Sequence, residues 1–282
     1  MVLGALCDTL VALSTIRMIG ATVPVLPPET PRNASETTAM HLLGDVTAVL
    51  MAKDPAAGGA KTRLTADGSW SAFDARFLAE VMLRCMAMRL HDAAVRLVLA
   101  VTPDGAGKRL ADRLGVGSVE VLDQGAGDLG RRLDRCWQRV GIDRPVAFFG
   151  GDTPDVPAQM LAEIPSALER CDVAVGPTGD GGYWTLAAAR HRPEVLVDVD
   201  WGSTHVYDQT RRNAIAAGLV VETLHVWHDV DHPADVEALR RRIRAAAHGS
   251  QDRPNETDPL QWMAEQMERF SPSSVPREST PS

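Results

Sequence analysis

The chain has 282 residues, of which 45% are hydrophobic and 23% charged, and its formal net charge is −8. This length and composition are typical of one globular domain of about 200 residues with flanking segments, large enough to bury a core without disulfides or structural metals. The negative charge gives no global basic field, so it excludes a protein that binds nucleic acid or anionic lipid through its overall charge. Phosphate binding would therefore need a few local Lys and Arg side chains.

The cysteines and the N-terminal segment indicate the compartment. The four cysteines are far apart and form no CxxC pair: Cys7, Cys85, Cys136 and Cys171. Cys85 and Cys136 sit in helical patterns among apolar residues, which favours buried free thiols over zinc ligands, and the set fits a reducing compartment. Residues 1–26 are fairly apolar, but an Asp interrupts them early and no Lys or Arg precedes Arg17, which makes a poor secretory signal. No stretch approaches the roughly 18 consecutive apolar residues of a membrane span. We expect a cytoplasmic protein.

Three segments are predicted along the chain. Residues 1–44 form an extension that ends in a Pro, Ser, Thr and Glu-rich linker over residues 27–39. The part before the linker is either a short appended helix or lies upstream of the translated chain, since Met40 stands just before the first strand. The folded domain is expected over residues 45–248. Residues 249–282 are expected to be a disordered tail with a weak amphipathic turn around residues 260–270.

Within the domain, strand and helix patterns alternate. Apolar runs of strand length cover residues 46–52, 96–101, 119–122, 146–149, 173–176, 183–188 and 219–226. Helical periodicity covers residues 72–91, 108–114, 129–140, 158–170, 206–217 and 234–246, and Pro165 is expected to kink or break the fourth of these helices. Strands that are apolar on both faces predict a mostly parallel sheet covered by helices. Ligands of such sheets bind at the carboxyl ends of the strands.

The first strand is followed by a loop of small residues, KDPAAGGAKTRL. Small residues such as Gly58 let backbone N–H groups approach an anion closely, and the cations Lys53, Lys61 and Arg63 surround them. The loop suits a diphosphate, although it lacks the spacing of a Walker A motif. The alternative interpretation is a surface loop with solvated lysines.

The fourth strand ends in Gly-Gly-Asp, which delivers Asp152 to the carboxyl edge of the sheet. A carboxylate there suits a hard divalent cation that bridges phosphate oxygens. The alternative is that an acid of this loop caps the following helix. We assign metal binding to Asp152 and capping to Asp155.

The fifth strand is followed by four glycines within seven residues, together with an acid and two aromatic residues. A hairpin needs fewer, so the excess predicts a close backbone approach to a ligand at Gly181 and Gly182. Asp180 is then a ligand or a base, and Tyr183 or Trp184 a platform for a ring. A purely structural loop is the alternative.

Two further features are candidates. Residues 124–132 place a glycine-rich turn, with Gln124 and Gly130, at a helix N-terminus that favours anions. Near the end of the domain two His and two Asp fall within five residues, and His228, Asp229 and Asp231 are candidate metal ligands. Equally, Asp231 caps the helix that Pro233 opens.

Five segments together resemble a known family: KDPAAGGAKTRL, QGAGDLGRRL, GGDTPDVP, GPTGDGGYW and WHDVDHPADVEAL. Their order and spacing are similar to those of the radical-SAM/selenodomain-associated transferase family, the arsenosugar-biosynthesis-type glycosyltransferases. The resemblance covers residues 46–245. The KTRL and GPxxDGGY elements are specific together, whereas GDTP alone is not. The resemblance implies a GT-A, nucleotide-diphospho-sugar transferase-like three-layer sandwich.

By position, the resemblance implies that Lys53, Lys61 and Arg63 face nucleotide phosphates. Asp152 matches the acid that ends the metal-binding strand, which implies Mg²⁺ or Mn²⁺, and residues 180–183 match the substrate loop. The sequence departs from the family pattern in two places. Residues 59–60 make the phosphate loop more flexible, and a proline interrupts the fourth helix.

The expected activity is a metal-dependent glycosyl transfer from a nucleotide-diphosphate sugar to a small-molecule acceptor, with Asp180 orienting the sugar or accepting the acceptor's proton. The alternative is a nucleotidyltransferase, guanylyl or similar, that acts on an NTP and a phosphorylated small molecule. The family is similar to guanylyltransferases of cofactor biosynthesis, which also carry a Lys-x-Arg-Leu element. A third interpretation is a non-catalytic nucleotide-binding protein. The nucleobase, sugar, acceptor and oligomeric state are not predicted.

Overall fold

The computed structural model describes residues 41–66, 68–249 and 258–269. The seven strands of these residues form one sheet in the order β3-β2-β1-β4-β6-β5-β7. The strands are β1 (Thr47–Lys53), β2 (Leu97–Thr102), β3 (Glu120–Asp123), β4 (Val146–Gly150), β5 (Val173–Pro177), β6 (Tyr183–Ala188) and β7 (Val221–Thr223). Only β6 runs antiparallel to its neighbours β4 and β5. The predicted α/β fold with a mostly parallel sheet is confirmed.

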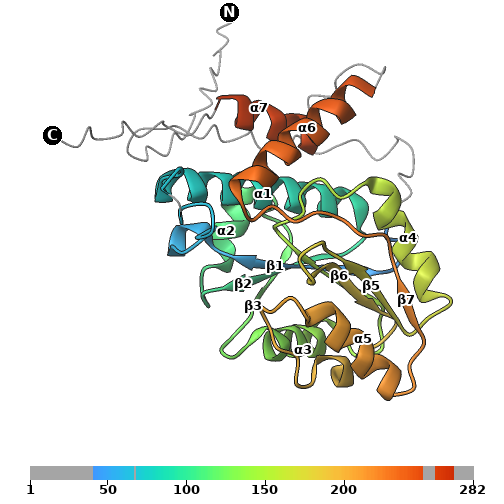
Figure 1. Ribbon diagram of the computed structural model, residues 1–282. Coiled ribbons are helices and arrows are strands. Elements are labelled where there is room, and N and C mark those ends of the chain that lie inside the picture. Colours follow the sequence, from blue (N-terminus) through green and yellow to red (C-terminus); the bar gives the residue numbers. More distant parts are fainter. Residues whose placement is uncertain (1–40, 67, 250–257, 270–282) are drawn as a thin grey trace, which may run out of the picture. The chain divides into compact units, whose positions relative to one another are not determined.

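Helices cover both faces of the sheet (Figure 1). They are α1 (Ala72–Ala93), α2 (Gly107–Leu114), α3 (Leu129–Val140), α4 (Ala158–Leu168), α5 (Val206–Ala216), α6 (Pro233–Gly249) and α7 (Pro259–Arg269). Helices α1, α2 and α4 lie on one face, α3 and α5 on the other, and α6 and α7 pack outside α1. Seven strand and six helix predictions match these elements, with bounds that differ by up to three residues at either end.

The strands are apolar on both faces because both faces are covered. In β1, Ala48 and Leu50 enter the core under α1, α2 and α4, whereas Val49 enters the core under α3 and α5. Strand β1 is central, with Ala48 aligned with Leu97 of β2 and Ala147 of β4. This register brings the carboxyl ends of β1, β2 and β4 to one edge.

Helix α1 is buried on two sides, which explains its length and its weak amphipathic pattern. It begins at a capping box in which Ser71 accepts from the Asp74 N–H and Asp74 accepts from the Ser71 N–H. Met86 and Leu90 face the sheet, whereas Met82 and Cys85 face α6 and α7. Helix α1 is therefore the platform on which the C-terminal helices rest.

Two expectations about helices need correction. Pro165 does not break its helix, because α4 continues to Leu168. The proline ring removes one N–H donor, but Ile164 and Ala167 are buried against the sheet and hold the last turn in place. Residues 259–269 of the expected tail form the eleven-residue helix α7, with Met263 and Met267 buried. The N-terminal extension up to residue 40 and residues 250–257 and 270–282 lie outside the described residues.

The cysteine prediction is confirmed for Cys85 and Cys136, which are free and buried, and Cys171 is free and buried as well. Burial raises the pKa of the Cys85 thiol to about 12 and that of Cys136 to about 11. Both thiols are therefore protonated and unreactive at neutral pH. Cys7 lies outside the described residues.

Candidate active site

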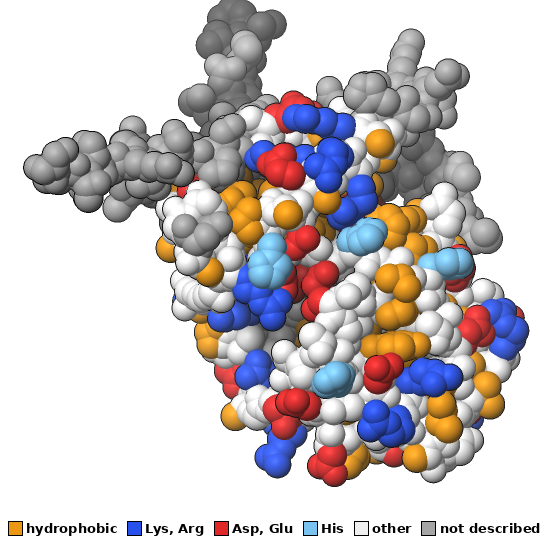
Figure 2. All heavy atoms as spheres, in the orientation of Figure 1, with side chains coloured by type: hydrophobic (Ala, Val, Ile, Leu, Met, Phe, Trp, Pro, Cys, Tyr) orange, Lys and Arg blue, Asp and Glu red, His pale blue; other side chains and the backbone are white. Residues whose placement is uncertain are grey.

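Four loops meet at the carboxyl edge of the sheet. They follow β1, β4, β5 and β7, and the last of them crosses the ends of the other strands. Its Trp227 N–H donates to the Pro177 carbonyl (3.0 Å), and its Val230 N–H donates to the Asp152 carbonyl (3.0 Å). The acids of residues 229–231 are thereby brought beside those that follow β4 and β5. On the face shown in Figure 2, acidic side chains gather beside Lys and Arg side chains.

The loop after β1 starts from a fixed turn. Asp54 is 4% exposed and accepts from the Ala56 N–H (2.9 Å), which opens a 3₁₀ turn over Pro55–Ala57. Arg113 of α2 donates to Asp54 and also to Glu80 of α1 (3.1 Å). The loop therefore leaves β1 in one direction, set by an ion pair from α2.

The glycines that follow this turn lie in the left-handed region, with φ of +85° at Gly58 and +65° at Gly59. Both are exposed. The exposed Lys53 at the end of β1 donates to the Gly59 carbonyl (3.0 Å) and closes the loop. This leaves an open stretch of small-residue backbone next to a cation, as a phosphate site requires.

Lys61 ties this loop to two others. Its side chain is 6% exposed, and Nζ lies 2.5 Å from Asp152 Oδ1 and 3.0 Å from Asp231 Oδ1. Nζ also donates to the Val230 carbonyl (2.5 Å). Burial alone would lower the pKa of Lys61, but the charges of the two aspartates outweigh it and raise the pKa. Arg63, 54% exposed, contacts the other oxygen of Asp231 (2.5 Å).

Three carboxylates form a compact group beside Lys61. Oxygens of Asp180, Asp229 and Asp231 lie within 4.8 Å of one another. Asp180 accepts from the Thr178 hydroxyl (2.6 Å) and the Gly182 N–H (3.0 Å). Carboxylate oxygens at this spacing could hold a hard divalent cation.

The pKa values of two members of the group, Asp229 and Asp180, are shifted in opposite directions. Burial, and then the charges of Asp180 and Asp231, raise the pKa of Asp229 to about 6. Burial acts to raise the pKa of Asp180 as well, but the hydrogen bonds from Thr178 and Gly182 outweigh it and lower the pKa. Asp180 is therefore the ionised member of the pair when Asp229 still holds a proton.

The structure only partly gathers the predicted metal ligands. Among the described residues, neither Asp152 nor His228 belongs to the compact group of carboxylates. Asp152 is 58% exposed and contacts the Lys61 ammonium. His228 is exposed, with its ring 5.4 Å from that of Trp227. Asp180, predicted from the glycine-rich loop, joins Asp229 and Asp231 instead.

The helix-capping predictions are wrong for two aspartates. Helix α4 begins after Pro157 without a side-chain cap, and Asp155 is instead buried in an ion pair with Arg242 of α6 (2.6 Å). Helix α6 is not capped by Asp231, whose oxygens contact the cations described above. Asp235, in the first turn of α6, accepts from the N–H groups of Asp231 and His232 (3.1 and 2.7 Å).

The loop after Asp152 is held by arginines that the sequence patterns did not single out. Arg242 reaches Asp155 from α6, and Arg89 of α1 donates to the Pro154 carbonyl (2.6 Å) and to the Val156 carbonyl. Trp227 Nε1 also donates to Asp155 (3.2 Å). No local signal identifies these partners, because they lie 65 to 87 residues from the loop.

Gly181, predicted to approach a ligand, instead approaches the chain itself, as does Gly176 near the end of β5. A Cβ at Gly181 would lie 1.9 Å from the Thr204 carbonyl oxygen, and the Tyr207 N–H donates to the Gly181 carbonyl (2.9 Å). A Cβ at Gly176 would lie 2.2 Å from the ring of Trp184. The glycines therefore dock the loop onto the segment before α5 and make room for an indole.

The aromatic residues of this loop belong to the core. Trp184 is 1% exposed and its Nε1 donates to the His225 carbonyl (3.0 Å), so it is not a platform for a ligand ring. Tyr183 packs against the core under α3 and α5, and burial raises the pKa of its hydroxyl.

The turn before α3 has its polar groups paired within the chain. Gln124 is 3% exposed and donates to the carbonyls of Ala52 and Ala100 (3.1 and 2.8 Å), which ties the ends of β1 and β2 together. Asp128 caps α3 by accepting from the Arg131 N–H (2.9 Å). Gly130 makes room for Trp201, since a Cβ there would lie 2.7 Å from the indole nitrogen.

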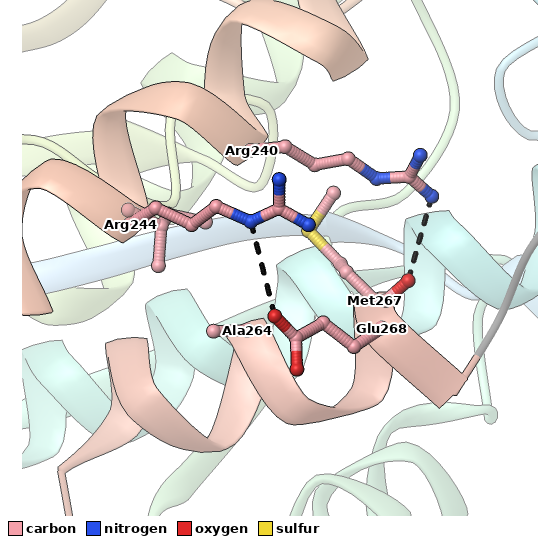
Figure 3. A pocket seen from close by; sticks show the side chains of 6 residues that line it. Arg240, Arg244, Ala264, Met267 and Glu268 are labelled. Carbon is pink, nitrogen blue, oxygen red and sulfur yellow. Dashed lines mark hydrogen bonds and ion pairs between the residues drawn. The ribbon is translucent and has the colours of Figure 1, made fainter.

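A separate pocket of about 260 Å³ lies between α6 and α7 (Figure 3). Its lining consists of Arg240, Ile243, Arg244, Ala264, Met267 and Glu268. Arg244 pairs with Glu268 (3.8 Å), and Arg240 donates to the Met267 carbonyl (3.4 Å). The pocket contains none of the predicted site residues, and its charged side chains have partners within the chain.

Comparison with known proteins supports the fold. A family model described as "Uncharacterized protein conserved in bacteria (DUF2064)" matches residues 85–203. The crystal structure of a "putative nucleotide-diphospho-sugar transferase" from Desulfovibrio desulfuricans G20 is 27% identical, with a TM-score of 0.66, over 80% of this chain and 97% of that one. The likeness and the sheet together confirm a nucleotide-diphospho-sugar transferase-like fold. The narrower resemblance to arsenosugar-type enzymes stays a prediction.

Two other solved structures are more distant. A nucleotidyl transferase from Methanothermobacter thermautotroptrophicus is 14% identical, with a TM-score of 0.48, over 71% of this chain and 98% of that one. A homolog of Mycobacterium tuberculosis Rv0371c from Mycobacterium sp. strain JC1 is 18% identical, with a TM-score of 0.46, over 72% and 98%. No curated protein matches the sequence. In the part of the chain that the structure describes, no helix has the length and apolarity to cross a membrane.

Proposed function

We propose that the chain is a metal-dependent glycosyltransferase that uses a nucleotide-diphosphate sugar as its donor. The observation that carries the proposal is the group of Asp180, Asp229 and Asp231 next to the small-residue loop with Lys53 and Arg63. Support also comes from the 27% identity to a protein described as a putative nucleotide-diphospho-sugar transferase.

In this proposal the three carboxylates hold Mg²⁺ or Mn²⁺, with Asp152 at the margin of the site. Bound there, the metal would neutralise charge on the departing diphosphate. Lys53 and Arg63, both exposed, contact the diphosphate from the loop after β1.

Asp180 is the candidate to face the acceptor, because it is exposed and its lowered pKa keeps the carboxylate ionised. The acceptor oxygen forms a bond to the anomeric carbon of the sugar as the bond from that carbon to the diphosphate oxygen breaks. The acceptor's proton passes to a carboxylate, with Asp180 as the candidate, and the nucleoside diphosphate leaves.

The alternative is nucleotidyl transfer, for which the Lys61-Thr62-Arg63-Leu64 element is the motivating observation. A phosphate of the acceptor would then attack the α-phosphorus of an NTP and pyrophosphate would leave. In both reactions the same loop would bind the phosphates and the same carboxylates would hold the metal.

A thermal-shift panel tests the proposal. The protein with Mg²⁺ or Mn²⁺ is heated in the presence of UDP-, GDP-, ADP- and dTDP-sugars and of the four NTPs. A ligand at about 100 times its dissociation constant adds about 2.7 kcal/mol of stability. Metal-dependent stabilisation by one nucleotide sugar supports the proposal and names the donor.

The same panel can refute it. Stabilisation by an NTP alone favours the nucleotidyltransferase, and a panel without any shift contradicts both reactions. Asp229→Asn should lose the metal-dependent shift, whereas the matched variant Asp143→Asn, in the exposed turn before β4, should keep it.

A further inference from the structure

Lys61 has no hydrogen left for a phosphate. An ammonium group donates three hydrogen bonds, and the three acceptors around Nζ are Asp152 Oδ1, Asp231 Oδ1 and the Val230 carbonyl. The side chain is 6% exposed, so the group is also shielded from an incoming ligand. In this arrangement the Lys61 ammonium neutralises the acids of the site and does not bind a diphosphate.

The ammonium and a divalent cation would share a ligand. Asp231 contacts Lys61 and also belongs to the compact group with Asp180 and Asp229. A cation bound to that group would lie close to the Lys61 charge, in a half-buried region where repulsion between like charges is only partly screened. Tight occupation by both cations at once is therefore unfavourable.

We infer that Lys61 is a built-in counter-cation of the acid cluster, which a divalent metal displaces. The inference rests on the metal binding of the proposed function and adds an exchange to it. The metal takes over the Asp231 oxygen that Lys61 contacts, and Lys61 moves out on its loop toward the diphosphate. Without metal, the lysine holds the three loops together by neutralising their acids.

The backbone permits this movement. Lys61 lies in the left-handed region (φ +51°), which is strained for a residue with a Cβ and is held here by the side-chain contacts. The neighbouring Gly58 and Gly59 are exposed and free of such strain. Arg63 stays on the second oxygen of Asp231, so the carboxylate keeps one cation while the other is exchanged.

The first test measures Mn²⁺ binding by electron paramagnetic resonance for the wild type and for Lys61→Met, which keeps the length of the side chain without its charge. The variant should bind Mn²⁺ about tenfold or more tightly, because a charge that repels the metal is gone. The control is Lys108→Met, since Lys108 is exposed on α2 and pairs only weakly with Asp112 (3.5 Å). Equal or weaker binding by a folded Lys61→Met protein overturns the inference.

The second test uses the wild type, so it does not depend on the folding of a variant. Amines are acetylated with acetic anhydride in the presence and absence of saturating Mn²⁺, and each lysine is followed by mass spectrometry. Lys61 should react slowly without metal and several-fold faster with it, relative to Lys108. A Lys61 rate that does not change with Mn²⁺ overturns the exchange.

The outcomes separate this inference from the proposed function. Binding by both proteins, tighter for Lys61→Met, supports the displacement, whereas binding by Lys61→Met alone overturns it, because the metal then never dislodges the lysine. Equal binding by both overturns the displacement and leaves the proposed metal site standing. Absence of binding in both overturns the displacement and contradicts the proposed metal site as well.

Discussion

Two glycine-rich loops at the same edge of the sheet differ in what their polar groups contact. The loop before α3 pairs them within itself and with the loop after β2: Gly125 N–H donates to Asp104 (3.0 Å), and Asp128 caps the helix. The loop after β1 leaves Gly58 and Gly59 exposed and sends its cations to acids on distant loops. Glycine content therefore does not identify an anion site. What distinguishes the loop after β1 is that its cations contact acids on other loops.

The largest expected effect concerns Asp231, the acid that Lys61 and Arg63 of the loop after β1 both contact. Asp231→Asn should weaken Mn²⁺ binding by about 100-fold or more, because it removes a charged ligand and the shared partner of Lys61 and Arg63. The matched change on the other loop, Asp128→Asn, should leave binding unchanged, since Asn also caps a helix. Electron paramagnetic resonance of Mn²⁺ measures both. An equal loss in the two variants would show that the two loops do not differ in this way.

The next effect concerns the ion pair that fixes the loop after β1. Arg113→Met leaves the buried Asp54 without its cation and should cost about 2 kcal/mol of unfolding free energy, less than a fully buried pair because Arg113 is 24% exposed. Arg135→Met, which removes donors to the carbonyls of Gln124 and Ala126, should cost about 1 kcal/mol. Urea denaturation gives both values. Only the first variant should also lose stabilisation by a nucleotide, and loss in both would contradict the comparison.

A smaller effect concerns pH. Because the pKa of Asp229 is raised to about 6, protons compete with the metal, and Mn²⁺ affinity should fall by up to about tenfold per pH unit below pH 6. In the metal-free protein, the folded state holds this proton more tightly than the unfolded state does. The resulting stability is fully present near pH 4 and is lost as the pH rises to about 6. Relative to Asp229→Asn, the wild type should therefore lose stability over that range, and parallel stability curves would contradict the raised pKa.

The sequence predicted much of the fold because the strands are buried on both faces and read as continuous apolar runs, whereas the helices show helical periodicity. The loops that carry the site followed, since parallel strands end at the same edge. Which acids meet could not be predicted. Asp229 and Asp231 reach Asp180 only because the segment after β7 crosses the ends of β5 and β4. Asp155 was mistaken for a cap because its partner, Arg242, lies 87 residues away.

The smallest expected effect separates a structural acid from a site acid. Asp128→Ala removes the hydrogen bond to the Arg131 N–H and should cost about 1 kcal/mol of unfolding free energy, the usual value of a lost N-cap. Metal and nucleotide binding should not change, since the carboxylate serves only its helix. A contradicting outcome would be that a nucleotide stabilises Asp128→Ala less than it stabilises the wild type, each compared with its own ligand-free protein. The loop before α3 would then contribute to ligand binding despite its paired amides, and the contrast between the two loops would have to be drawn from charge alone.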